Sequence, residues 1–252
     1  MKEGSVKQDY DRRFSTLERL YGAEGLARLA ETHVVVIGIG GVGSWAVEAL
    51  ARSAIGQLTL IDLDNIAESN INRQIHALSR TIGAPKVEEM ARRIAEINDR
   101  CQVNIIEDFL TVDNLKEYLA APRENYWIID AMDQVKVKAA LIAFAKREKY
   151  RIITTGAAGG KQDAAQLLVD DLNATFHDPL CARLKSILRK EYGFPSHTQK
   201  SGIPIVFSQE NRAPVKNASG GLSCQGYGSS VAVTATMGLL AANYVINKVV
   251  KG

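Results

Sequence analysis

The most constraining feature of this sequence is an early run of β-branched residues that stops abruptly at a cluster of glycines. Residues 33–37 read HVVVI, a composition typical of a buried strand. Residues 42–50 then have the apolar spacing of a helix face, and a second apolar run, residues 58–61, ends at Asp62. This order of strand, glycine turn, helix, strand and acid is typical of a βαβ unit that binds a nucleotide.

Each part of this unit has a role in holding a nucleotide. Glycines allow a tight turn and a close approach of the backbone to phosphate. The helix that follows offers unpaired N–H groups and a partial positive charge at its N-terminus. Asp62 is expected to accept hydrogen bonds from the ribose hydroxyls. The glycines expected to bind the nucleotide are Gly38, Gly40, Gly41 and Gly43.

The residues after Asp62 favour a triphosphate over NAD, the commonest ligand of such a unit. Polar and cationic side chains crowd this stretch, and a lysine opens the next expected helix, residues 86–97. Arginine and lysine at this distance suit the charge of a triphosphate, which exceeds that of the NAD pyrophosphate. We therefore expect an ATP site. The expected contacts in this part of the chain are Asn70, Arg73, Gln74 and Lys86.

Length and composition indicate a soluble protein with a sizeable core. The chain has 252 residues, of which 46% are hydrophobic and 23% charged, as in ordinary globular proteins. A net charge of +3 neither requires nor excludes a nucleic-acid partner. The three cysteines include no Cys-x-x-Cys pair, so neither structural zinc nor a disulfide framework is expected. The first residues lack the apolar core of a signal peptide, which favours a cytoplasmic location.

Patterning along the rest of the chain predicts alternating strands and helices. The further strands are expected at residues 103–106, 126–131, 151–155, 165–169 and 203–208. The further helices are expected at residues 10–31, 134–149, 182–192 and 231–250. The predicted class is α/β, a Rossmann-like nucleotide-binding sheet flanked by helices, with a loop-rich C-terminal extension and a final helix. We expect a single domain over residues 1–252, because no repeat or linker interrupts the chain.

An acidic residue follows the strand expected at residues 126–131. Ligands of open α/β sheets bind beyond the carboxyl ends of the strands, so Asp133 is well placed to hold Mg²⁺ against phosphate oxygens. A second interpretation makes Asp133 the N-cap of the helix expected at residues 134–149, and the two roles are compatible.

Residues 178–221 form a basic, loop-rich segment that we interpret as a possible tRNA-facing insertion. A solvated helix face is the simpler explanation of its cations. Contact with an RNA backbone is the more specific explanation, because lysine and arginine neutralise phosphates. The residues concerned are Arg183, Lys185, Arg189 and Lys190.

Two further stretches have alternative interpretations. Residues 231–250 carry almost no charge and are long enough to span a bilayer, but polar and small residues favour a helix buried in the core or at a subunit contact over a membrane segment. Cys224 lies in a glycine-rich loop before this helix, where a thiol can be exposed and activated. A small buried residue is the alternative, and Cys181 is the rival nucleophile.

Four separated motifs resemble the ubiquitin-activating-enzyme-like (ThiF-type) superfamily, whose members adenylate carboxylates with ATP. The motifs are GIGGVGS, LIDLDNIAESNINRQ, Lys86 and IIDAMDQVKVKAAL. The resemblance implies that the glycines cradle the nucleotide, that Asp62 holds its ribose and that Asp133 binds Mg²⁺. It implies that Asn70, Arg73, Gln74 and Lys86 grip the triphosphate. It also implies a homodimer and a catalytic arginine from the N-terminal helix, often acting across the dimer, for which Arg13 and Arg19 both match.

Further motifs look like the bacterial tRNA threonylcarbamoyladenosine dehydratases. They are INRQIHALSRTIGAPK, TTGAAGG, DPLCARL and SVAVTATMGLLAA. The resemblance implies ATP-dependent cyclisation of N6-threonylcarbamoyladenosine beside the tRNA anticodon, through an acyl adenylate that expels AMP. It leaves room for a sulfur-transfer partner and for Na⁺ or K⁺ at the C-terminal loops.

Two alternatives stay open. The first is an adenylyltransferase that activates the C-terminal glycine of a small sulfur-carrier or ubiquitin-like protein, although the paired Cys-x-x-Cys zinc motifs of such enzymes are missing here. The second is a non-catalytic module that binds ATP and RNA.

Overall fold

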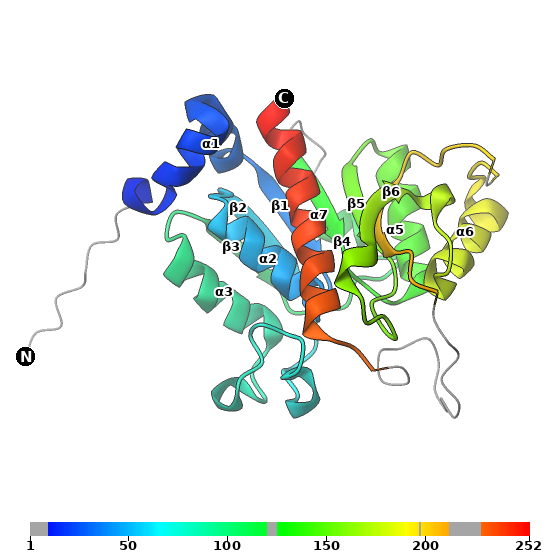
Figure 1. Cartoon of the computed structure of the whole chain (residues 1–252), viewed down its shortest axis with the longest axis horizontal. Coiled ribbons are helices and arrows are strands. Elements are labelled where there is room, and N and C mark those ends of the chain that lie inside the picture. The colour runs from blue at the N-terminus through cyan, green and yellow to red at the C-terminus, as the bar shows by residue number, and fades with distance from the viewer. Residues whose placement is uncertain (1–9, 120–124, 197, 212–227) are drawn as a thin grey trace, which may run out of the picture.

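The structure, a computed structural model, describes residues 10–119, 125–196, 198–211 and 228–252 and contains one seven-stranded sheet (Figure 1). Its strand order is β3-β2-β1-β4-β5-β7-β6, and all neighbours are parallel except β6 and β7. The strands are β1 (His33–Ile37), β2 (Gln57–Ile61), β3 (Gln102–Ile106), β4 (Tyr126–Asp130), β5 (Arg151–Thr155), β6 (Leu167–Asp171) and β7 (Pro204–Ser208). The order of the first five strands is that of a Rossmann-like sheet, which confirms the predicted fold class.

Helices cover both faces of this sheet. They are α1 (Tyr10–Ala30), α2 (Gly43–Arg52), α3 (Lys86–Ile97), α4 (Leu115–Tyr118), α5 (Val135–Arg147), α6 (Pro179–Tyr192) and α7 (Val231–Lys251). Single 3₁₀ turns occupy η1 (Glu68–Asn70), η2 (Ser79–Thr81), η3 (Ala164–Gln166) and η4 (Leu172–Ala174). The one-turn helix α4 and the 3₁₀ turns were not predicted, because such short pieces carry no periodic pattern.

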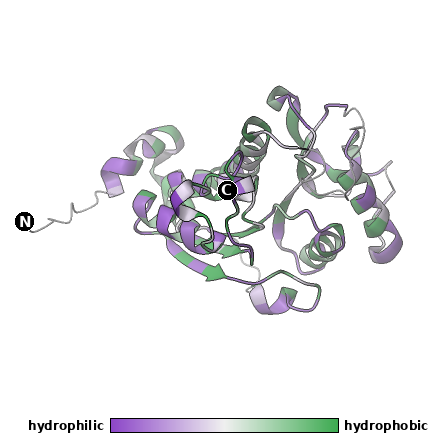
Figure 2. Ribbon diagram, turned by 90° about the horizontal axis from the view of Figure 1, so that it is seen from below, coloured by the Kyte–Doolittle hydropathy of each residue, from purple (hydrophilic) through white to green (hydrophobic). Residues whose placement is uncertain are grey.

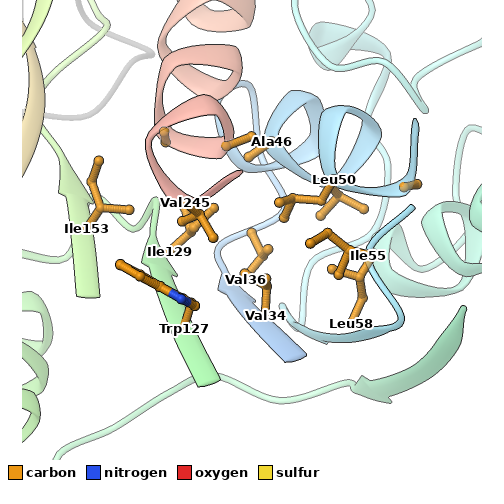
Figure 3. Packing of buried hydrophobic residues seen from close by; sticks show 14 of the residues in the cluster. Val34, Val36, Ala46, Leu50, Ile55, Leu58, Trp127, Ile129, Ile153 and Val245 are labelled. Atoms are coloured by element: carbon orange, nitrogen blue, oxygen red, sulfur yellow. The ribbon is translucent and has the colours of Figure 1, made fainter. Parts of the chain in front are cut away.

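Two hydrophobic cores lie on opposite faces of the sheet, and β1 contributes to both. Val34 and Val36 belong to the core under α2, α3 and α7, whereas Val35 and Ile37 belong to the core under α5 and α6. Figure 3 shows Val34 and Val36 below Leu50 of α2, with Val245 of α7 nearby. A strand buried on both faces is apolar at every position, which explains the unbroken HVVVI run.

The final helix α7 is part of the first core. Val233, Met237, Ala241, Val245 and Val249 are buried at intervals of four residues. In Figure 1, α7 crosses the sheet beside α2, against which it packs. A Cβ at Gly238 would lie 2.3 Å from the carbonyl oxygen of Val42, so glycine permits this close approach. By length and composition α7 also qualifies as a membrane span, but half of its most apolar window is buried inside the protein, as expected of a core helix.

Part of residues 178–221, the segment expected to be a tRNA-facing insertion, belongs to the sheet itself. Strand β7 lies between β5 and β6, so this segment supplies an interior strand of the sheet. Helix α6 begins at Pro179, three residues before the predicted start, because Asp178 caps it by accepting a hydrogen bond from the N–H of Cys181. Proline is favoured at this first helical position, where its missing N–H costs nothing.

Candidate nucleotide-binding site

The strand register brings the loops after four strands to one edge of the sheet. Ile37 at the end of β1 pairs with Ile61 of β2 and Asp130 of β4, and Ile61 pairs with Ile106 of β3. The strand order reverses between β1 and β4, which is where α/β sheets form their binding crevice. A cavity of about 410 Å³ lies there.

Nine of the predicted contact residues line this cavity. They are Gly38, Gly40, Gly41, Asp62, Asn70, Arg73, Gln74, Lys86 and Asp133. The structure therefore brings together residues that lie up to 95 positions apart in the chain. Gly43, Arg13, Arg19 and Cys181 are not among the lining residues.

The glycine loop depends on glycine at two positions. Gly38 has a φ of 85°, and a Cβ there would lie 3.0 Å from the carbonyl oxygen of Ala131. A Cβ at Gly43 would lie 1.8 Å from the carbonyl oxygen of Gly38. Gly43 thus serves the close packing of α2 against the loop rather than forming part of the cavity wall.

The peptide units of Ile39 are anchored from both sides. Its N–H donates to Asp62 Oδ2 at 2.6 Å, and its carbonyl oxygen accepts from His76 Nε2 at 2.9 Å. Burial raises the pKa of Asp62, and the neighbouring Lys86 opposes this shift. Burial lowers the pKa of His76 to about 4, so at neutral pH the ring is uncharged and donates through Nε2. Sequence reasoning missed His76, because a single histidine without ligand spacing gives no functional signal.

Lys86 lies at the first position of α3 and is 5% exposed. Its Nζ lies 2.7 Å from Asp64 Oδ2 and 3.8 Å from Asp62 Oδ1. Asp64 also accepts a hydrogen bond from the Lys86 N–H through its carbonyl oxygen at 3.1 Å. Asp64 therefore holds the lysine in place, a role that the sequence alone did not assign to it.

The loop that follows β2 supplies the other polar groups. Arg73 Nη1 donates to the carbonyl oxygen of Ser69 at 2.7 Å, and Trp45 Nε1 donates to the carbonyl oxygen of Arg73 at 3.0 Å. Trp45 thereby joins this loop to α2. Gln74 is 6% exposed, and its Oε1 has no hydrogen-bond partner among the described residues. A buried acceptor without a partner at a cavity wall fits a ligand that brings its own donor.

Asp133 is not the N-cap of α5. Gln134 occupies that position, without a side-chain capping bond. Asp133 is exposed at the cavity, and it has no ion pair or hydrogen bond within the described part of the chain. Mg²⁺ is usually held by one or two carboxylates together with phosphates and water, so this carboxylate fits the ion. The described residues contain no group of three or more His, Cys, Asp or Glu that would form an all-protein metal site.

The opposite wall of the cavity comes from the C-terminal half. It includes the small residues 156–159 after β5, and Pro179 and Leu180 at the start of α6. Thr234 of α7 also lines the cavity but lies beside the glycine loop, where a Cβ at Gly41 would be 3.3 Å from its Cγ2. Asp178 Oδ2 accepts from the N–H of Ala157 at 2.9 Å, which ties this small-residue loop to α6. Sequence reasoning did not assign these residues to the site, although the TTGAAGG motif, used only for the family resemblance, could have indicated them.

The two candidate arginines of α1 differ in their surroundings. Arg13 Nη1 donates to the carbonyl oxygens of Glu96 and Ile97, at 3.0 and 2.9 Å, and so caps the end of α3 in the same chain. Arg19 is exposed and makes no hydrogen bond or ion pair within the described residues.

The structure argues against Cys181 as a nucleophile. Its side chain is fully buried, and burial together with the Asp178 carboxylate raises its pKa well above the ordinary value. A reactive thiol requires exposure and a lowered pKa. Cys224 lies outside the described residues.

Comparison with known proteins identifies the family. The ThiF family matches residues 10–251, so the chain belongs to this family. It is 46% identical to the tRNA threonylcarbamoyladenosine dehydratase of Haemophilus influenzae, over 96% of this chain and 95% of that protein. The solved structure of the Escherichia coli tRNA N6-threonylcarbamoyladenosine dehydratase in complex with ATP is 43% identical, with a TM-score of 0.88 and coverage of 97% and 96%. The molybdopterin-synthase adenylyltransferase of Salmonella typhimurium is 34% identical over only 56% of this chain and 55% of that protein.

Proposed function

We propose that this protein catalyses the ATP-dependent dehydration of N6-threonylcarbamoyladenosine in tRNA. The observation that supports the proposal most is the cavity at the β1–β4 edge, which gathers the predicted ATP contacts and ends at an exposed carboxylate. Relatives that bear this name match almost the whole chain, whereas the adenylyltransferase matches about half of it.

The reaction begins with a threonine carboxylate, which is a poor electrophile because its charge repels nucleophiles. Attack of a carboxylate oxygen on the α-phosphorus of ATP forms an acyl adenylate and releases pyrophosphate. An internal atom of the threonylcarbamoyl group then attacks the activated carbonyl, closes a ring and expels AMP. The net change in the nucleoside is the loss of one water, and because ring closure is intramolecular it needs no enzyme nucleophile.

The residues of the cavity have distinct tasks in this scheme. The glycine loop, Gly38, Gly40 and Gly41, approaches the phosphates through its backbone, and Asp62 faces the ribose. Arg73 and Lys86 stabilise the negative charge that develops on the phosphates. Asp133 would hold Mg²⁺, which supplies further charge stabilisation at the phosphate oxygens. Asn70 and Gln74 complete the polar wall.

Helix α6 is the surface we assign to the tRNA backbone. It begins at the cavity wall and runs to the edge of the molecule opposite α1, where hydrophilic turns are visible (Figures 1 and 2). Arg183, Arg189 and Lys190 are exposed, and the described residues include no carboxylate paired with them. Lys185 donates to the carbonyl oxygen of Thr175 at 2.7 Å. Cations without acidic partners, on a path that leads into the cavity, fit a phosphate backbone.

Further parts of the proposal come from the family resemblance. We propose a homodimer in which Arg19 reaches the nucleotide of the partner subunit, because Arg13 is engaged with α3 of its own chain. A cytoplasmic location, a sulfur-transfer partner and a monovalent cation, Na⁺ or K⁺, at the C-terminal loops are likewise proposals.

The decisive test is to incubate the protein with Mg·ATP and tRNA that carries the modified adenosine, followed by mass analysis of the nucleosides. We expect one AMP for each nucleoside that loses one water. AMP formation that requires a carrier protein ending in Gly-Gly, with tRNA unchanged, would instead favour the adenylyltransferase. Nucleotide binding without any AMP would favour a non-catalytic module.

A further inference from the structure

Three buried polar side chains lie directly beneath the turn that carries Asp133. Asp130 and Lys138 have fully buried side chains, and Lys138 Nζ lies 2.8 Å from Asp130 Oδ2. Thr154 Oγ1 donates to the same carboxylate oxygen at 2.7 Å and accepts from Lys138 Nζ at 2.8 Å. We call Asp130, Lys138 and Thr154 the buried triad. No step of the proposed reaction uses these three residues.

Stability alone is a poor explanation of the buried triad. Removing two charges from water is costly, and well-packed hydrophobic side chains of similar volume often stabilise a core equally well. The ion pair between Glu48 and Arg93 differs from the triad because 34% of the Arg93 side chain remains exposed. The two charges of the triad therefore carry the full cost of removal from water, because neither side chain reaches solvent.

The hydrogen bonds of the triad converge on the backbone around the cavity edge. Asp130 Oδ1 accepts from the N–H of Met132 at 3.2 Å, and Lys138 Nζ also donates to the carbonyl oxygen of Asp130 at 3.3 Å. The Lys138 N–H donates to the carbonyl oxygen of Gln134 at 2.9 Å. The end of β4 and the first turn of α5 are therefore tied together around residues 131–134.

All four residues of the turn 131–134 line the cavity. Asp133 is exposed and makes no side-chain bond within the described part of the chain, so its own side chain does not hold it in place. Its position depends on the backbone of the turn, which the triad holds from below. Groups that orient a ligating residue commonly change metal affinity by 10- to 100-fold when they are removed.

We propose that the buried triad is a positioning unit that holds the turn of residues 131–134, so that the Asp133 carboxylate faces the phosphates and their divalent cation. This inference rests on the proposed function both for the metal role of Asp133 and for its activity readout. The triad touches no substrate, and it acts through the backbone of the turn.

The test compares Lys138→Met, Thr154→Val and Lys138→Arg with the control Glu48→Gln. Mn²⁺ affinity is measured by electron paramagnetic resonance with a non-hydrolysable ATP analogue, and analogue affinity is also measured without metal. We expect Lys138→Met and Thr154→Val to weaken Mn²⁺ binding and to lower kcat for AMP formation, each by about tenfold. The metal-free affinity and the KM for tRNA stay near those of the wild type. Lys138→Arg, which keeps the charge, restores part of the loss, and Glu48→Gln lowers only the melting temperature.

Thr154→Val decides the question if Lys138→Met does not fold, because it removes one hydroxyl and keeps the volume. Wild-type Mn²⁺ affinity and kcat in folded Thr154→Val would overturn the proposal. An equal loss of Mn²⁺ affinity and kcat in Glu48→Gln would also overturn the proposal, because the losses would then result from general destabilisation of the protein. If the wild type forms no AMP, the proposed function fails, while Mn²⁺ affinity still tests the triad.

Discussion

The two walls of the cavity are built in different ways. The wall from β1, β2 and α3 is polar, and its side chains hold one another, as in the contacts of Asp62 with Ile39 and of Lys86 with Asp64. The wall from β5 and α6 consists mostly of small or apolar residues joined by few side-chain bonds. A preorganised polar wall suits a charged nucleotide, whose phosphates need fixed donors. A smoother wall leaves room for a second, larger substrate.

The largest effect is expected at the polar wall. On the proposed function, Lys86→Met removes the cation assigned to the phosphates, so AMP formation should fall by about 10²- to 10³-fold. The measurement is the rate of tRNA-dependent AMP release at saturating ATP. Lys116→Met, on the exposed surface of α4, is the matched control and should retain full activity. A Lys86→Met protein that folds and turns over normally would contradict the assignment of this wall to the nucleotide.

His76 makes the polar wall sensitive to acid. Its pKa of about 4 in the folded chain lies below the unfolded value of about 6.5, so its contribution to stability is present above pH 6.5 and is lost as the pH falls towards 4. We expect a loss of about 2 kcal/mol in the free energy of unfolding at pH 5, and about 3 kcal/mol below pH 4. Urea unfolding at pH 7 and pH 5 measures this difference. In His76→Gln the difference in unfolding free energy between pH 7 and pH 5 should shrink by about 2 kcal/mol. An unchanged pH dependence in this variant would show that His76 is not the group responsible.

The opposite side of the cavity is tested by neutralising α6. The combined change of Arg183, Lys185, Arg189 and Lys190 to glutamine should weaken tRNA binding by roughly tenfold or more at moderate salt, while the KM for ATP stays constant. The dependence of log K on log[salt] should flatten, by about 0.7 to 0.9 for each phosphate contact that is lost. Lys116→Gln with Lys251→Gln provides a control of exposed cations elsewhere. Unaltered tRNA affinity would mean that these cations form a solvated face.

The smallest effects separate the two arginines of α1. Arg13→Ala removes the donor to the last carbonyls of α3 and should cost about 1 kcal/mol, or about 2–4 °C in melting temperature. Arg19→Ala should leave the melting temperature unchanged and lower kcat by up to roughly tenfold, if this arginine stabilises phosphate charge in the partner subunit. Calorimetry and AMP release on both variants measure the two effects. The reverse pattern would assign the catalytic role to Arg13.

Much of this arrangement follows from short-range rules. Within the described residues, short apolar runs predicted every strand and the helical spacing of apolar residues predicted every α-helix except α4, because burial imposes such patterns locally. Glycine spacing and an acid at the end of the second strand predicted the nucleotide loop, and proximity to strand ends predicted Asp133 at the cavity. Element boundaries shifted where capping intervened, as at Asp178 and Pro179 before α6.

Other features depend on segments that are distant along the chain. No local pattern indicates that β7 enters the sheet between β5 and β6, that His76 supports Ile39, or that Lys138 reaches Asp130 and Thr154. The sequence likewise does not show whether a free cysteine is buried. Only the packing in the structure shows that Cys181 is buried and therefore unsuited to be a nucleophile. Local propensity depends on neighbours within a few residues, whereas a buried polar contact depends on which backbone segments the folded sheet brings side by side.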